Sequence, residues 1–209
     1  LPVVNAGADV TICEGDSTTL IATGGDTYLW STGATTASIN VSPNSTTTYS
    51  VTATSNGCSS NDDVEVTVNQ APTANAGSDV TICDGGTTTL TASGGASYLW
   101  STGATTASIN VSPNSTTNYT VTVTTNGCSS NDDVEVTVNP LPNADAGASV
   151  SICEGDSTTL TATGGGTYLW NTGATTASIN VSPTSTTTYF VTVTNNGCSA
   201  NDDVLVTVN

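Results

Sequence analysis

The stretch WSTGATTASINVSP, residues 30–43, indicates the architecture of the chain because it returns at a fixed spacing. The same residues occupy positions 100–113, and the version at 170–183 differs only in having Asn171 where the others have serine. The segments on either side of it repeat in the same register without an insertion. A constant period of this length indicates an array of like modules, so the function is expected to belong to the array.

The cysteines follow the same period. Each is separated by 70 positions from its equivalent: Cys13, Cys83 and Cys153 form one set, and Cys58, Cys128 and Cys198 form the other. We therefore expect three domains, residues 1–70, 71–140 and 141–209, taken from a longer array at a linker. Modules of about 70 residues bury little surface, so covalent staples would help them. Two cysteines at fixed places in every module favour disulfides and an oxidising compartment.

Within one period, short runs of alternating apolar and polar residues predict strands, and Gly, Asn, Ser and Pro mark the turns. Six or seven short strands with a single central tryptophan predict an all-β fold, namely a tandem array of three antiparallel β-sandwiches. Tyrosine near the start of the penultimate strand fits this fold. The aromatic residues expected in the core, rather than on a sugar-stacking surface, are Trp30, Trp100, Trp170, Tyr49, Tyr119 and Tyr189.

Charge excludes several functions. The chain has no Lys, Arg or His and 17 acidic residues, for a net charge of −17. Nucleic-acid binding requires cations, and anionic membranes repel such a chain. Neither an imidazole nor an amine side chain is present to activate a nucleophile or to transfer protons near neutral pH. We expect no enzyme, no nucleic-acid partner, no cofactor and no membrane insertion in this segment.

Five motifs carry a resemblance to a known group. They are NAGxDVTICxG, TTLxAxGG, YLWSTGATT, TTxYxVT and NGCSxNDDV, and they recur in all three periods with few changes. Together they resemble the Ig-like and PKD-like repeats of very large surface proteins in the Bacteroidota. The resemblance covers nearly the whole chain. It implies Ig-like/PKD-like sandwiches, export by the type IX system, and a place in the stalk of an adhesin or another appendage.

Disulfide connectivity stays open between alternatives. In an Ig-like topology the first turn and the last hairpin lie at opposite ends of a sandwich, too far apart for a Cys13–Cys58 bond. The leading hypothesis joins neighbouring repeats and leaves Cys58 and Cys153 to pair with repeats outside this segment. Its bonds are Cys13–Cys128 and Cys83–Cys198. The second joins cysteines within each repeat, as Cys13–Cys58, Cys83–Cys128 and Cys153–Cys198, and bonds between chains are the third.

Acidic pairs recur in every repeat and raise the question of calcium. They are Asp62, Asp63, Asp132, Asp133, Asp202 and Asp203. Carboxylates suit Ca²⁺, but neighbouring strand residues face opposite sides, and edge charge that discourages aggregation is the simpler interpretation. We therefore expect no metal site. Ser17 and Ser157, in Asp-Ser-Thr sequences, resemble the O-glycosylation acceptors of Bacteroidota.

The function that these observations favour is structural. We expect a spacer or shaft segment of a long extracellular fibre or cell-surface adhesin, which provides length, stiffness and resistance to proteases. Its partners would be neighbouring repeats of the same chain and, in a fibre, identical chains. The alternative is a repeated glycan- or protein-binding module. The turns argue against it, because they are built from Gly, Ser, Thr and Asn and vary little between repeats.

Overall fold

A computed structural model describes all residues 1–209, and strands are its only regular secondary structure. The first repeat holds β1 (Val10–Cys13), β2 (Thr18–Ile21), β3 (Thr27–Trp30), β4 (Ser38–Val41), β5 (Thr47–Ser55) and β6 (Cys58–Asn69). The second holds β7 (Val80–Cys83), β8 (Thr88–Thr91), β9 (Ser97–Trp100), β10 (Ser108–Val111), β11 (Thr117–Thr125) and β12 (Cys128–Asn139). The third holds β13 (Val150–Ile152), β14 (Thr158–Thr161), β15 (Thr167–Trp170), β16 (Ser178–Val181), β17 (Thr187–Asn195) and β18 (Cys198–Val208).

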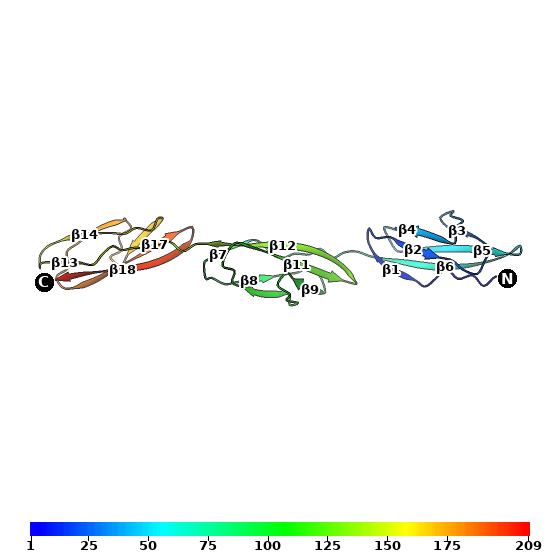
Figure 1. The fold of residues 1–209 in the computed structure, drawn as a ribbon, viewed down its shortest axis with the longest axis horizontal. Coiled ribbons are helices and arrows are strands. Elements are labelled where there is room, and N and C mark those ends of the chain that lie inside the picture. The colour runs from blue at the N-terminus through cyan, green and yellow to red at the C-terminus, as the bar shows by residue number, and fades with distance from the viewer. The chain divides into compact units, whose positions relative to one another are not determined.

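Each repeat forms two sheets, and Figure 1 labels strands of each repeat. In the first repeat the larger sheet has the order β1-β6-β5-β3, and the smaller sheet pairs β2 with β4. The other two repeats have the same order in their equivalent strands. The expected all-β array of three sandwiches is therefore confirmed, with six strands in each repeat.

The first strand of each repeat differs from the expected antiparallel pattern. β1 runs parallel to β6, with Val10 opposite Val66 and Cys13 opposite Asn69. Just before β1, Asn5 pairs instead with Thr23, beside the other sheet. The segment between them thus changes sheets without turning back, and Gly7 allows this with a φ of 97°. A strand that crosses in this way arrives parallel to the last strand.

The core lies between the two sheets and is apolar. Trp30 and Trp100 are 2% exposed and Trp170 is 1% exposed, packed among valine, isoleucine and leucine side chains. The indole N–H of Trp30 donates a hydrogen bond to the Thr36 carbonyl at 3.0 Å, so its polar atom is satisfied. Tyr119 and Tyr189 are buried, whereas Tyr49 is partly buried against the same core. The predicted aromatic residues therefore lie in or against the core.

Contacts along the chain group it into two compact units. The first comprises Leu1–Gly77, Thr91–Ser108 and Thr120–Asp133, and the second comprises Ser78–Leu90, Ile109–Tyr119 and Val134–Asn209. The first unit contains both Cys13 and Cys128, and the second contains both Cys83 and Cys198. The joints described below therefore lie within these units.

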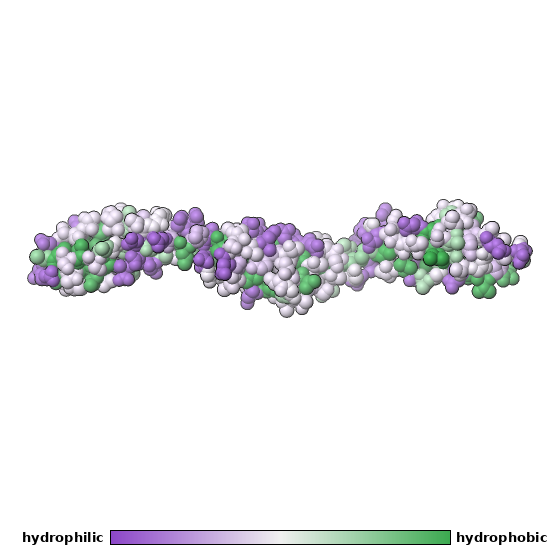
Figure 2. Space-filling model, viewed as in Figure 1, coloured by the Kyte–Doolittle hydropathy of each residue, from purple (hydrophilic) through white to green (hydrophobic).

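The surface carries scattered apolar residues among polar ones. Figure 2 shows them as small green patches on the face drawn. Leu29, Leu99 and Leu169 occupy equivalent exposed positions on the edge strands β3, β9 and β15. No segment forms a helix of the length and hydropathy needed to cross a bilayer.

Candidate functional site: the joint between repeats

Strand β6 sets the distance between the two cysteines of a repeat. Cys58 is its first residue, and Cys13 pairs in register with its last residue, Asn69. Eleven residue steps along an extended strand span about 36 Å. A disulfide needs Cα atoms within about 7 Å, so a folded repeat cannot join its own two cysteines. The within-repeat alternative is therefore absent from the structure for a geometric reason.

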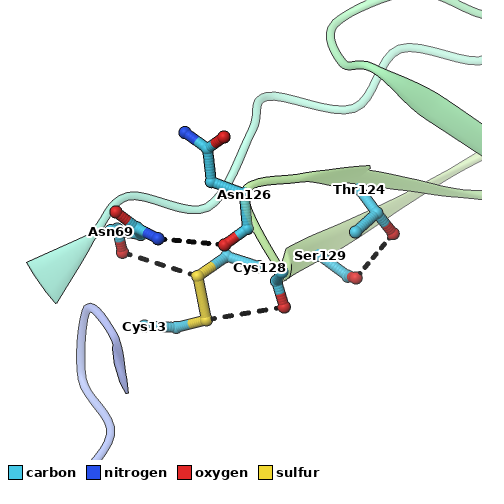
Figure 3. The surroundings of a disulfide bond; sticks show 7 residues. Cys13, Asn69, Thr124, Asn126, Cys128 and Ser129 are labelled. Atoms are coloured by element: carbon cyan, nitrogen blue, oxygen red, sulfur yellow. Dashed lines mark hydrogen bonds between the residues drawn. A yellow bond between two sulfur atoms is a disulfide. The ribbon is translucent and has the colours of Figure 1, made fainter. Parts of the chain in front are cut away.

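The structure instead joins the cysteines of neighbouring repeats. Cys13 is bonded to Cys128 with a Cα–Cα distance of 5.6 Å, and Cys83 is bonded to Cys198 at the same distance. Figure 3 shows the first of these bonds between the end of β1 and the start of β12. Each bond closes a loop with a sequence separation of 115. Closing a loop of this size lowers the entropy of the unfolded chain, which stabilises the folded state by about 4–5 kcal/mol at 25 °C.

Asn69 connects the two repeats through hydrogen bonds beside the disulfide. Its backbone carbonyl accepts the Glu14 N–H at 2.9 Å, which ties the end of β6 to the first turn of the same repeat. Its side-chain amide donates to the Asn126 carbonyl of the next repeat at 2.9 Å, as Figure 3 shows. Asn139 and Asn196 repeat this second bond at 3.0 Å. The joint is therefore held by a covalent bond and by at least one hydrogen bond.

A tight hairpin presents Cys128 to its partner. Asn126 and Gly127 form the two-residue turn between β11 and β12, with φ values of 51° and 82°. Positive φ at both positions defines a type I′ turn, for which Asn-Gly is the preferred sequence. The Asn126 carbonyl that accepts the Asn69 amide belongs to this turn. The Asn-Gly-Cys sequence thus supplies the turn, the acceptor and the sulfur atom together.

The two remaining cysteines are free thiols and exposed. The equivalents of Cys58, Cys128 and Cys198, are disulfide-bonded and 1% exposed. The equivalents of Cys153, Cys13 and Cys83, are disulfide-bonded and partly buried. A shallow hollow of about 290 Å³ beside Cys58 is lined by Leu1, Pro2, Ser55 and Asn56. Cys58 and Cys153 thus have no disulfide partner among residues 1–209.

A wider hollow of about 580 Å³ lies at the Cys13–Cys128 bond. It is lined by Thr11, Ile12, Cys13, Asp16, Ser17, Asn126, Gly127 and Cys128. Ser17, one of the two predicted O-glycosylation positions, is exposed at this hollow, and Ser157 is also exposed. Both hydroxyls are therefore accessible to a modifying enzyme.

The acidic pairs have a structural use that the sequence did not reveal. Asp62 accepts the backbone N–H of Ala6 at 2.8 Å, and Asp132 and Asp202 accept the equivalent N–H groups at the same distance. This contact ties the N-terminal segment of each repeat to its last strand. Their neighbours Asp63 and Asp203 are exposed. No group of three or more His, Cys, Asp or Glu side chains is close enough to hold a metal ion.

A second carboxylate contact explains a substitution between repeats. Asp9 accepts the Glu65 N–H at 2.9 Å, and Asp79 does the same for Glu135. In the third repeat the hydroxyl of Ser149 accepts the Leu205 N–H at 3.4 Å. A serine oxygen can replace a carboxylate as an acceptor of one hydrogen bond. The position needs an acceptor rather than a charge.

Comparisons with known proteins show the fold. No protein-family model and no curated protein matches the chain. Among solved structures, it is similar to a three-Ig structure of titin domains I67–I69 in an E-to-A mutated variant, with a TM-score of 0.53 and 13% identity. It is also similar to the I-band fragment I67–I69 from titin, with a TM-score of 0.52 and 13% identity. Each comparison covers 100% of this chain and 98% of the titin chain. The chain therefore has the fold of Ig domains in tandem.

Proposed function

We propose that this chain is a spacer segment of a long extracellular fibre or cell-surface adhesin. The observation that carries the proposal is the bond between neighbouring repeats, Cys13–Cys128 and Cys83–Cys198. A disulfide within a domain stabilises that domain, whereas a disulfide between domains restricts how they move against each other. An array whose joints are clamped in this way has the stiffness that a shaft requires.

The composition of the repeats supports a mechanical role. Their turns contain small polar residues, and the tryptophans that could stack on a sugar are buried. The chain offers no basic side chain for catalysis or for binding anions. It also lacks the Lys and Arg residues at which trypsin-like proteases cut. Such a segment needs no cofactor and suits an environment rich in proteases.

We place the segment outside the cell, where disulfides persist. The proposed setting is a surface protein of the Bacteroidota exported by the type IX system, and this part rests on the sequence motifs quoted above. Cys58 and Cys153 would bond to cysteines of flanking repeats, which continues the same clamp. Ser17 and Ser157 would carry O-linked glycans, and peptides containing these serines from native-host protein would then be heavier than their amino-acid sequence.

Small-angle scattering tests the clamp directly. The oxidised chain is compared with the Cys13→Ser and Cys83→Ser double variant, in which neither of the two inter-repeat bonds can form, after alkylation of its remaining thiols. We expect the distribution of interatomic distances to broaden in the variant, because its repeats pivot at the linkers. Identical distributions would show that the bonds do not restrict the joints and would remove the basis for a stiff shaft. Specific binding to a glycan or protein surface by isolated repeats would favour the adhesion module instead.

A further inference from the structure

The two disulfides overlap along the sequence. One spans residues 13–128 and the other spans residues 83–198, so the stretch between Cys83 and Cys128 lies inside both. The overlap arises because each bond has a sequence separation of 115, which exceeds the repeat period of 70. Every peptide bond from Cys13 to Cys198 therefore lies inside at least one loop that a disulfide closes.

We infer that the overlapping bonds form a covalent ladder, which keeps the array in one piece after any single cut in its backbone between Cys13 and Cys198. A cut divides a chain only if no other covalent path connects the two sides. Here at least one disulfide always spans the cut, and two disulfides span it between Cys83 and Cys128. The fragments stay attached even if the cut repeat unfolds.

The linkers are where this protection matters. Gln70 and Ala71 are exposed and lie outside the strands, as do Pro140 and Leu141 of the second linker. Exposed segments without regular structure are the preferred sites of proteolysis. Bonds within repeats would use the same six cysteines, but each linker would then be the only covalent connection between the two repeats that it joins. The connectivity between repeats thus protects the segments that a protease reaches most easily.

Three covalent paths connect one joint to the next. The shortest runs from Cys128 back to Cys83 through 45 residue steps, and the other two run through 70 steps each, from Cys13 to Cys83 and from Cys128 to Cys198. A chain under tension is limited by its shortest path. The ladder therefore also limits how far an unfolded repeat can extend, to about 150–160 Å rather than about 230–250 Å. Resistance to cutting and a limit on extension follow from the same connectivity.

The biological purpose of the ladder rests on the proposed spacer function, whereas its connectivity does not. The connectivity test below does not depend on where the protein is located or what it binds. A failed test would remove the ladder and leave an extracellular spacer of another design. Discovery of a binding activity would remove the spacer and leave the ladder.

The test places the recognition sequence of a site-specific protease in one linker of the full chain. One variant carries it between Gln70 and Ala71, and a second carries it between Pro140 and Leu141. Free thiols are alkylated before cleavage so that disulfides cannot exchange. After complete cleavage, we expect a single species of full mass on a non-reducing gel and two fragments after reduction. Release of separate fragments without reductant from either variant would overturn the inference.

A matched control uses the Cys83→Ser and Cys198→Ser double variant, which lacks only the second bond. Cleavage in the first linker should still leave the fragments joined, because Cys13–Cys128 spans that site. Cleavage in the second linker should now separate them without reductant, because no remaining bond spans it. The same protein thus gives opposite results at two sites. Separation at both sites would contradict the assigned connectivity.

Discussion

Removing one disulfide should lengthen the fully stretched chain by a fixed amount. When Leu1 and Asn209 are pulled apart, the shortest covalent path runs to Cys13, across to Cys128, back to Cys83, and across to Cys198. It contains about 68 residue steps, so its limit is about 220–245 Å at 3.3–3.6 Å per step. With both Cys83→Ser and Cys198→Ser, the path grows to about 93 steps and about 310–335 Å. Full reduction gives about 208 steps and about 690–750 Å.

Single-molecule force spectroscopy measures these limits as contour lengths. The chain is held by its ends, its free thiols are alkylated, and it is stretched until no further unfolding event occurs. The double variant gives the decisive reading. If each repeat joined its own cysteines, this variant would retain only a Cys13–Cys58 bond and would reach about 163 steps, or about 540–590 Å. A contour length near that value would refute the ladder, whereas one near 310–335 Å would support it.

Two further contrasts test the fold by chemical denaturation. Gly127→Ala should lower the free energy of unfolding by about 1–2 kcal/mol, because alanine is strained at this positive φ although its Cβ meets open space. Gly94→Ala should lower it clearly more, because the added Cβ would also collide with the Thr73 carbonyl. Asp202→Ala should lower the free energy of unfolding by about 1.5–3 kcal/mol, because the Ala146 N–H loses its charged acceptor. Asp203 is exposed, so Asp203→Ala should change it by less than about 0.5 kcal/mol. Equal effects within either pair would contradict these contacts.

The sequence was sufficient for the parts of the fold that depend on periodicity. Alternating apolar residues place Val51 and Val64 inside, and a single tryptophan per period occupies the centre of each core. Asn and Gly, expected in turns, form the hairpin before the last strand, because few other dipeptides accept two positive φ values at low cost. These features follow from local geometry, which the order of residues determines directly.

The parts that were missed depend on which distant groups meet. Alternation gives the faces of β1 but not its direction relative to β6, so the parallel pairing was not predicted. The inward position of Ala6, which is 1% exposed, follows from the crossing between sheets before that strand. Asp62 was interpreted as edge charge, although its carboxylate accepts the Ala6 N–H. A pattern of charges shows where acceptors are, but only the folded chain shows which donors reach them.

The length of β6 also bears on which sulfur pairs form when the chain is oxidised. Cys58 lies 45 residues after Cys13, whereas the partner Cys128 lies 115 residues after it, so the wrong thiol is nearer in the unfolded chain. Once β6 has paired with β1, its twelve residues hold Cys13 and Cys58 at opposite ends. In a folded repeat the last strand thus prevents the wrong bond and leaves Cys13 to react with the following repeat.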